Sequence, residues 1–113
     1  MIQWLHLGIN QASRQEAEKV AKLFQMLFGF ESQVKGSSLF TCHDQIELMT
    51  APGRGTHGHI GLISDNLESD MEHIRECGFE WDETSGAYFQ DQLMSIYLKD
   101  EIAGFAVHLV RKH

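Results

Sequence analysis

Two segments of the chain have apolar residues at the spacing of an amphipathic helix. The first covers residues 13–29, where Ser13 and Glu16 form a capping box ahead of the apolar stripe. Gly29 follows the stripe and can end the helix in the left-handed conformation. A second, shorter helix is predicted over residues 65–78, which show the same period between a capping residue and a glycine.

Stretches of alternating apolar and polar residues surround both helices, a pattern typical of half-buried strands. One stretch precedes each helix and three follow it, so each half of the chain reads strand, helix, three strands. The predicted strands cover residues 4–9, 30–36, 37–44, 45–51, 57–62, 79–85, 93–100 and 104–112, and residues 85–92 are predicted as a turn. We therefore predict an α+β fold made of two tandem βαβββ modules.

A glycine-rich segment around Pro52, the only proline, separates the two halves. The length of 113 residues is that of one domain with one substantial core region rather than of two independent domains. We predict a single domain with module one at residues 1–52, a connector at residues 53–57 and module two at residues 58–113.

Two similar strands, 53 residues apart, each have a histidine at the same step. His6 lies between Leu5 and Leu7 in "WLHLGI", and His59 precedes Ile60 in "HGHIGL". Because successive strand residues point to opposite faces, the apolar residues can pack on a helix while both histidines point away from it.

The last strand of each half has one polar residue on that same face. Glu47 stands between two apolar residues in "IEL", and His108 stands between two in "VHL". If the sheet curls into a trough, the four groups converge. Imidazole nitrogen and carboxylate oxygen are ligands of zinc, nickel, iron and manganese, so we predict a divalent-metal site formed by His6, Glu47, His59 and His108.

Composition and charge narrow the choice of partners and location. The formal net charge of −7 disfavours nucleic acid and anionic membranes as partners. The two cysteines, Cys42 and Cys77, lack the spacing of a disulfide framework, and no apolar run approaches the length of a membrane span. We expect a cytoplasmic protein with reduced thiols that binds a small molecule.

Several other residues are candidates for the ligand pocket. Arg54 in the connector can meet a substrate carboxylate or phosphate, and Trp4 and Tyr97 can wall the pocket, although each of these residue types more often serves structure or solvation. His57 lies on the face of His59 and is an alternative donor to the metal.

The segments "LHLGI", "GHIGLISDN" and "YLKDEIAGFAVHLV" resemble the vicinal-oxygen-chelate superfamily, which includes glyoxalase I, bleomycin-resistance proteins and extradiol dioxygenases. The resemblance implies a curved, mostly antiparallel sheet around a trough, with metal ligands on the first and last strands of each module. It also implies that modules pair within one chain or across a dimer, and we expect a homodimer. The closest likeness is to small domains appended to 2-keto-3-deoxy-6-phosphogluconate aldolases.

The resemblance implies a metal-dependent lyase or isomerase that acts on a small oxygen-chelating metabolite such as a 2-oxo acid, with Glu47 as the candidate base. One departure is His108, because the family normally has a glutamate there that takes part in moving the substrate proton. Two alternatives stay open: a module that binds a small molecule without chemistry, as resistance proteins do, and an Fe(II) extradiol-type dioxygenase.

Overall fold

The computed structural model describes residues 1–113 and has the predicted order of elements, strand, helix and three strands, twice. The elements are β1 (Ile2–Ile9), α1 (Arg14–Phe28), β2 (Gln33–Lys35), β3 (Ser38–Thr41), β4 (Ile46–Leu48), β5 (Gly58–Ser64), α2 (Leu67–Glu76), β6 (Trp81–Phe89), β7 (Gln92–Leu98) and β8 (Phe105–Arg111). The predicted α+β fold class is confirmed.

Both helices begin and end at the residues that their sequences favour. The hydroxyl of Ser13 accepts a hydrogen bond from the backbone N–H of Glu16 at 3.2 Å, and Gly29 ends α1 with a φ of 76°. Asn66 caps α2 by accepting from the N–H of Ser69 at 3.3 Å. Neither helix has the length and apolar character needed to cross a membrane.

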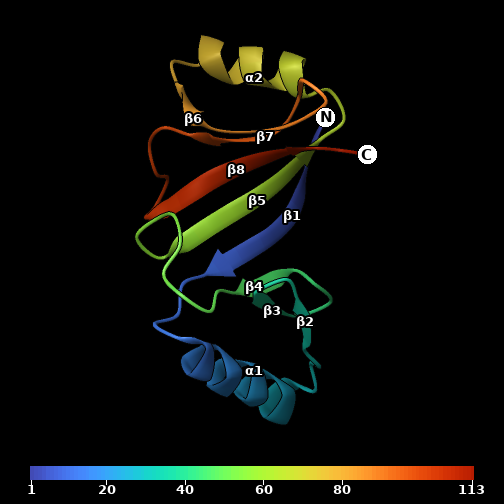
Figure 1. The fold of residues 1–113 in the computed structure, drawn as a ribbon, viewed down its shortest axis with the longest axis vertical. Helices are drawn as coiled ribbons and strands as arrows, with labels where there is room; N and C mark the ends of the chain where they lie inside the picture. Colours follow the sequence, from blue (N-terminus) through green and yellow to red (C-terminus); the bar gives the residue numbers. More distant parts are fainter.

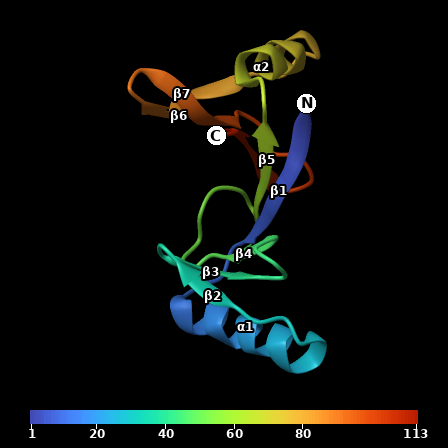
Figure 2. The ribbon, with the colours of Figure 1, turned by 90° about the vertical axis from the view of Figure 1, so that its right-hand side faces the viewer.

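All eight strands form one sheet in the order β2-β3-β4-β1-β5-β8-β7-β6. The pairs β1–β4 and β5–β8 are parallel and the other pairs are antiparallel. The pair β1–β5 joins the two halves, and the helices lie at opposite ends of the molecule (Figure 1). Figure 2 shows the outer strands turning away from β1 and β5, so that the sheet is curved. One chain therefore brings the first and last strands of both halves side by side.

Each helix packs against apolar residues of its own half. The smaller cluster lies under α1 and the larger one under α2, where the indole N–H of Trp81 donates to the backbone oxygen of Met71 at 3.1 Å. The buried members are Ala17, Ala21, Leu39 and Leu48 in the first cluster and Leu67, Met71, Trp81, Ile96, Leu98, Val107 and Leu109 in the second. Because the neighbours of Glu47 and His108 are among them, these two residues face away from the helices.

The prediction of a long turn at residues 85–92 is wrong. Strand β6 continues to Phe89, and only Gln90 and Asp91 form the turn, both with positive φ. The pairing of β6 with β7 is irregular around Ala87. Such a bulge admits extra residues into a strand and interrupts the alternation from which the strand was predicted.

Candidate metal centre

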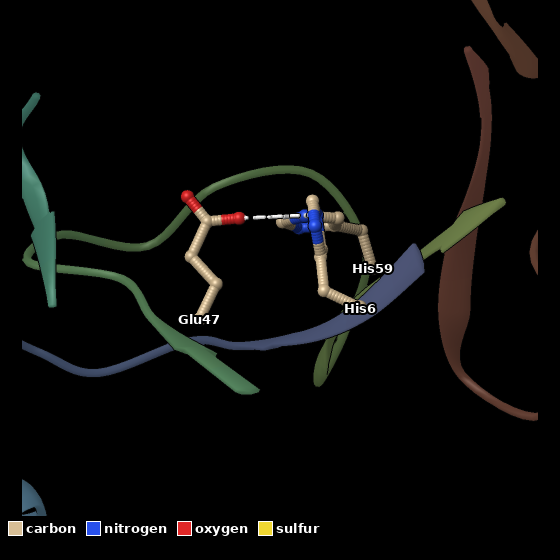
Figure 3. Close-up of side chains that lie close together, drawn as sticks. All are labelled: His6, Glu47 and His59. Atoms are coloured by element: carbon tan, nitrogen blue, oxygen red, sulfur yellow. Dashed lines mark hydrogen bonds and ion pairs between the residues drawn. The ribbon is translucent and has the colours of Figure 1, made fainter. Parts of the chain in front are cut away.

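Three side chains from three strands meet at the middle of the sheet. The Nε2 atoms of His6 (β1) and His59 (β5) are 3.0 Å apart, and Oε1 of Glu47 (β4) lies 3.3 Å from the first and 3.1 Å from the second. Figure 3 shows the carboxylate and the two rings pointing toward one another. His59 is buried and the other two are partly buried. All three residues were predicted as ligands, and the structure brings them together within one chain.

The spacing of these three atoms fits a bound metal ion. An ion with bonds of about 2.0–2.1 Å to nitrogen and oxygen keeps neighbouring ligand atoms about 2.9–3.4 Å apart, the range seen here. Hydrogen bonds alone satisfy the group poorly. If both rings are neutral and one Nε2 carries a proton, the lone pairs of the other Nε2 and of the carboxylate oxygen face each other. If both Nε2 atoms carry a proton, their two N–H groups point at each other. A cation at the centre accepts all three lone pairs.

Two glycines shape the floor beneath the histidines. A Cβ atom on Gly8 would lie 2.1 Å from the ring of His59, and one on Gly61 would lie 2.8 Å from the ring of His6. The register pairs Gly8 with His59 and His6 with Gly61. Each histidine of an H-x-G triplet thus rests on the glycine of the other triplet, and this packing holds both rings over the sheet.

Ser38 on β3 orients the carboxylate. Its hydroxyl donates to Oε2 of Glu47 at 2.7 Å, which leaves Oε1 facing the histidines. Burial raises the pKa of the Glu47 carboxyl, but the hydrogen bonds from His59 and Ser38 outweigh burial and hold the pKa below its usual range. Sequence reasoning missed Ser38. The alternation around buried Leu39 could have found it, because it places Ser38 on the face of Glu47.

The structure does not bring His108 into this group of three. Its ring stacks on Tyr97, with centroids 4.3 Å apart and planes 8° from parallel, and lies 6.4 Å by centroid from the ring of His59. Burial lowers the pKa of His108 to about 4, and burial likewise lowers the pKa of His6. His108 therefore borders the cluster as a neutral ring.

The predicted pocket residues divide into two groups. The guanidinium of Arg54 lies 4.6 Å from the ring centroid of Tyr97 and forms an ion pair with Asp82 at 2.8 Å, so Tyr97 contacts both Arg54 and His108. Trp4, the other residue predicted to wall the pocket, does not lie on the face of His6 to which strand alternation would assign it. A bulge between them places Trp4 opposite Leu62, which packs in the α2 core.

His57, the alternative donor, is not among the three clustered residues. It is exposed, and its ring packs near that of Phe105, with centroids 5.8 Å apart. Its backbone N–H donates to the carbonyl of Gly104 at 2.9 Å. The alternation that put His57 on the face of His59 does not bring its imidazole to the cluster, because the chain turns at Gly58, where φ is 145°.

Burial of His108 predicts a pH dependence of stability in chelator-treated protein. Below pH 6.5 the unfolded chain protonates this imidazole, whereas the folded chain keeps it neutral down to about pH 4. The free energy of unfolding should therefore fall by about 3 kcal/mol as the pH falls across this window. Urea unfolding at several pH values measures it, and His108→Gln should flatten the curve. Parallel curves for the two proteins would contradict the prediction.

The comparisons with known proteins concern mainly the fold. No model of a known protein family matches the chain. A curated protein of Emericella nidulans, described as "FAD-dependent monooxygenase sdgC", is 31% identical over 64 residues, which are 53% of this chain and 14% of that protein. The chain thus matches about a seventh of the length of that relative, a share that says nothing of the activity of the whole protein.

Solved structures match over nearly the whole chain. A methylmalonyl-CoA epimerase has a TM-score of 0.68 at 13% identity and covers 97% of this chain and 94% of its own. A hypothetical protein, BH1468 from Bacillus halodurans C-125, has a TM-score of 0.66 at 13% identity, with coverages of 99% and 95%. The chain has the glyoxalase-like fold of these two structures.

Other structures with this fold match less closely, among them a methylmalonyl-CoA epimerase from Mycobacterium tuberculosis. Its TM-score is 0.59 at 12% identity, with coverages of 97% of this chain and 87% of that one. Identities this low establish the fold and leave the substrate open. The likeness to aldolase-associated domains within this fold stays a prediction.

Proposed function

We propose that this chain is a divalent-metal-dependent isomerase or lyase that removes a proton next to a carbonyl of a small, oxygen-chelating anion such as a 2-oxo acid. The observation behind the proposal is the set of three donor atoms 3.0–3.3 Å apart, contributed by His6, Glu47 and His59. A divalent cation held there would polarise a substrate carbonyl and stabilise the negative charge that develops as the proton leaves.

The charge of the site favours an anionic chelator. Two neutral imidazoles and one carboxylate leave a divalent ion with a formal charge of +1, and the neutral ring of His108 does not change this value. Arg54 adds a second positive charge beside Tyr97. Because Arg54 is now paired with Asp82, a substrate carboxylate would have to compete with that ion pair. Tyr97 would form the wall of the pocket beneath the substrate carboxylate.

Glu47 is the proposed base. Its Oε1 is committed to the cluster, so Oε2 is the oxygen that would accept the substrate proton. Oε2 now accepts a hydrogen bond from Ser38, which would have to weaken as the proton arrives. The same hydroxyl can then hold the protonated carboxyl in place for the return of the proton to carbon, which an isomerase requires.

The names of the structural neighbours are compatible with this reaction type. Several are methylmalonyl-CoA epimerases, and one of them was solved with methylmalonyl-CoA and NH4+. Epimerisation is a proton removal and return at a carbon beside a carbonyl.

The test is hydrogen exchange at the carbon next to the substrate ketone, which is C3 of a 2-oxo acid. Chelator-treated protein reloaded with zinc, nickel, manganese or, without oxygen, Fe(II) should bind about one ion per chain. The loaded protein should then speed the loss of the C3 proton NMR signal of a 2-oxo acid in D2O. Glu47→Gln should lower the exchange rate by at least about 100-fold. The control Glu76→Gln, at the exposed end of α2, should not change it. Binding of metal without exchange of any 2-oxo acid or CoA ester would favour the non-catalytic binding module.

A second candidate is an Fe(II) dioxygenase of the extradiol type. Two histidines and one carboxylate with neighbouring coordination positions free form the ligand set of non-haem Fe(II) oxygenases, and His108 does not fill a fourth position. Anaerobic Fe(II) loading followed by oxygen-electrode measurements with a panel of catechols tests it. Oxygen uptake by Fe(II) protein and none by zinc protein would replace the isomerase proposal with this one.

A further inference from the structure

A cavity of about 620 Å³ lies in the first half of the chain, next to the metal centre. Its apolar lining residues are Phe28, the last residue of α1, Phe30, two residues further along, and Phe40 on β3. The ring of His43 closes another side, 6.0 Å by centroid from that of Phe30 and at 73° to it. The other lining residues, Asp44 among them, are polar, apart from Gly29.

Phe40 connects this cavity to the metal centre. The register pairs Phe40 directly with Glu47, and alternation therefore places both side chains on the same face of the sheet. The ring of Phe40 is 5.9 Å by centroid from the ring of His6. Phe40 therefore lines the cavity and also stands beside a residue of the His6–Glu47–His59 cluster.

Part of the aromatic surface that lines the cavity is exposed to solvent. Phe28 is 61% exposed, and its ring centroid lies 6.2 Å from that of Phe30. Exposing such rings to water costs free energy that an apolar guest would recover. Exposed aromatic side chains offer edges and faces against which another flat ring can pack.

The corresponding part of the second half has a different character. The tripeptide Gly-Phe-Glu follows both helices, with Phe30 in the first half and Phe79 in the second. The cavity near the second tripeptide is lined mainly by charged residues and does not include Phe79; its lining is Arg75, Glu80, Trp81, Asp82, Glu83 and Lys99. The two ends of the trough therefore differ, with an aromatic cavity beyond Phe40 and an ion pair beyond Tyr97.

We propose that the cavity walled by Phe28, Phe30 and Phe40 binds an aromatic tail of the ligand whose two oxygens are held at the metal centre. The substrate class is then an oxygen chelator with an aryl or aralkyl group, and not a small aliphatic acid. This inference rests on the proposed function for the position of the chelating head. The tail site itself rests on the aromatic walls and on the contact between Phe40 and His6.

The test compares two inert chelators that differ only in a phenyl ring, acetohydroxamate and phenylacetohydroxamate. Calorimetry on zinc-loaded protein should show at least about tenfold tighter binding of the phenyl compound, since burying even part of a ring is worth that factor. Phe30→Ala, and Phe28→Ala as an exposed position that tolerates change, should each reduce this ratio by at least about threefold. Phe79→Ala, the matched control, should leave the ratio unchanged.

A metal-free arm separates this inference from the proposed function. In chelator-treated protein, saturation-transfer NMR should detect the phenyl protons of phenylacetamide, with the signal lost in Phe30→Ala and kept in Phe79→Ala. If zinc does not bind but this pattern holds, the metal proposal fails and the tail site stands. If the two hydroxamates bind equally to zinc protein, or if Phe30→Ala and Phe79→Ala behave alike, the tail site is overturned. Loss of the signal at concentrations where the protein dimerises would assign these rings to a second copy instead, and would also overturn it.

Discussion

Replacing His59 with alanine is expected to lower metal affinity by more than about 100-fold. His59 supplies one of the three clustered atoms, and the residue is buried, with 5% of its surface exposed. An exposed side chain therefore cannot take its place as a ligand. Partners that merely orient a metal ligand are already worth about 10–100-fold in affinity, and loss of a ligand should exceed this range. Competition with a chromophoric chelator measures the affinity, and circular dichroism of the same samples checks the fold.

Three further variants make the His59 result decisive. Glu47→Gln keeps the side-chain volume and removes the charge, so it separates loss of metal from loss of packing. His57→Ala changes an exposed imidazole two residues from His59 and should leave affinity unchanged. His108→Ala should cost less than about tenfold, because its ring stacks on Tyr97 outside the group of three. An equal loss for His108→Ala and His59→Ala would show that four residues hold the ion.

Replacing Gly8 with alanine is expected to weaken metal binding by about 10–100-fold, although the variant keeps all three candidate ligand residues. The new methyl group would start 2.1 Å from the ring of His59, a distance no pair of carbon atoms tolerates, so the ring must move off its site. Gly61→Ala should act in the same direction on His6 but less strongly, because its closest approach is 2.8 Å. Metal affinity and Tm of the chelated protein are the two measurements.

The matched control for the glycine variants is Gly53→Ala in the connector. A Cβ there meets its nearest atom at 3.4 Å, an ordinary contact, and Gly53 has no positive φ that would strain an alanine. We expect metal affinity within about twofold of the parent protein. If Gly8→Ala binds metal as tightly as Gly53→Ala does, the histidine ring is not fixed by the floor of the site.

The sequence predicted the fold because the same signals occur twice. Helix periods, caps and strand alternation agree in both halves, and the histidine at the same step of two similar strands revealed the duplication. Alternation also placed Glu47 and His108 on the face opposite the helices, as the buried neighbours Leu48 and Leu109 show. The prediction worked wherever a strand was regular.

Irregular strands and side-chain packing limited what the sequence could show. The bulge after Trp4 turned this residue away from the pocket that it was predicted to wall, and the irregular pairing of β6 hid the end of that strand. The strand face on which a histidine lies also does not show whether its ring joins the metal cluster or only lies next to it. The displacement of His108 follows from its parallel stacking on Tyr97, which depends on side-chain rotamers that no pattern of residue types encodes.

Each imidazole packs on a glycine of the other repeat, so the substitutions that one repeat can accept depend on the residues of the other. Positions 8 and 59 form one unit and positions 6 and 61 form another, and each unit has one member in each repeat. A copy that loses its histidine frees the glycine of its sister to acquire a side chain, after which the lost residue cannot simply return. After a duplication of this kind, substitutions at these positions should occur in pairs across the two repeats, and reversal of one member alone should be blocked.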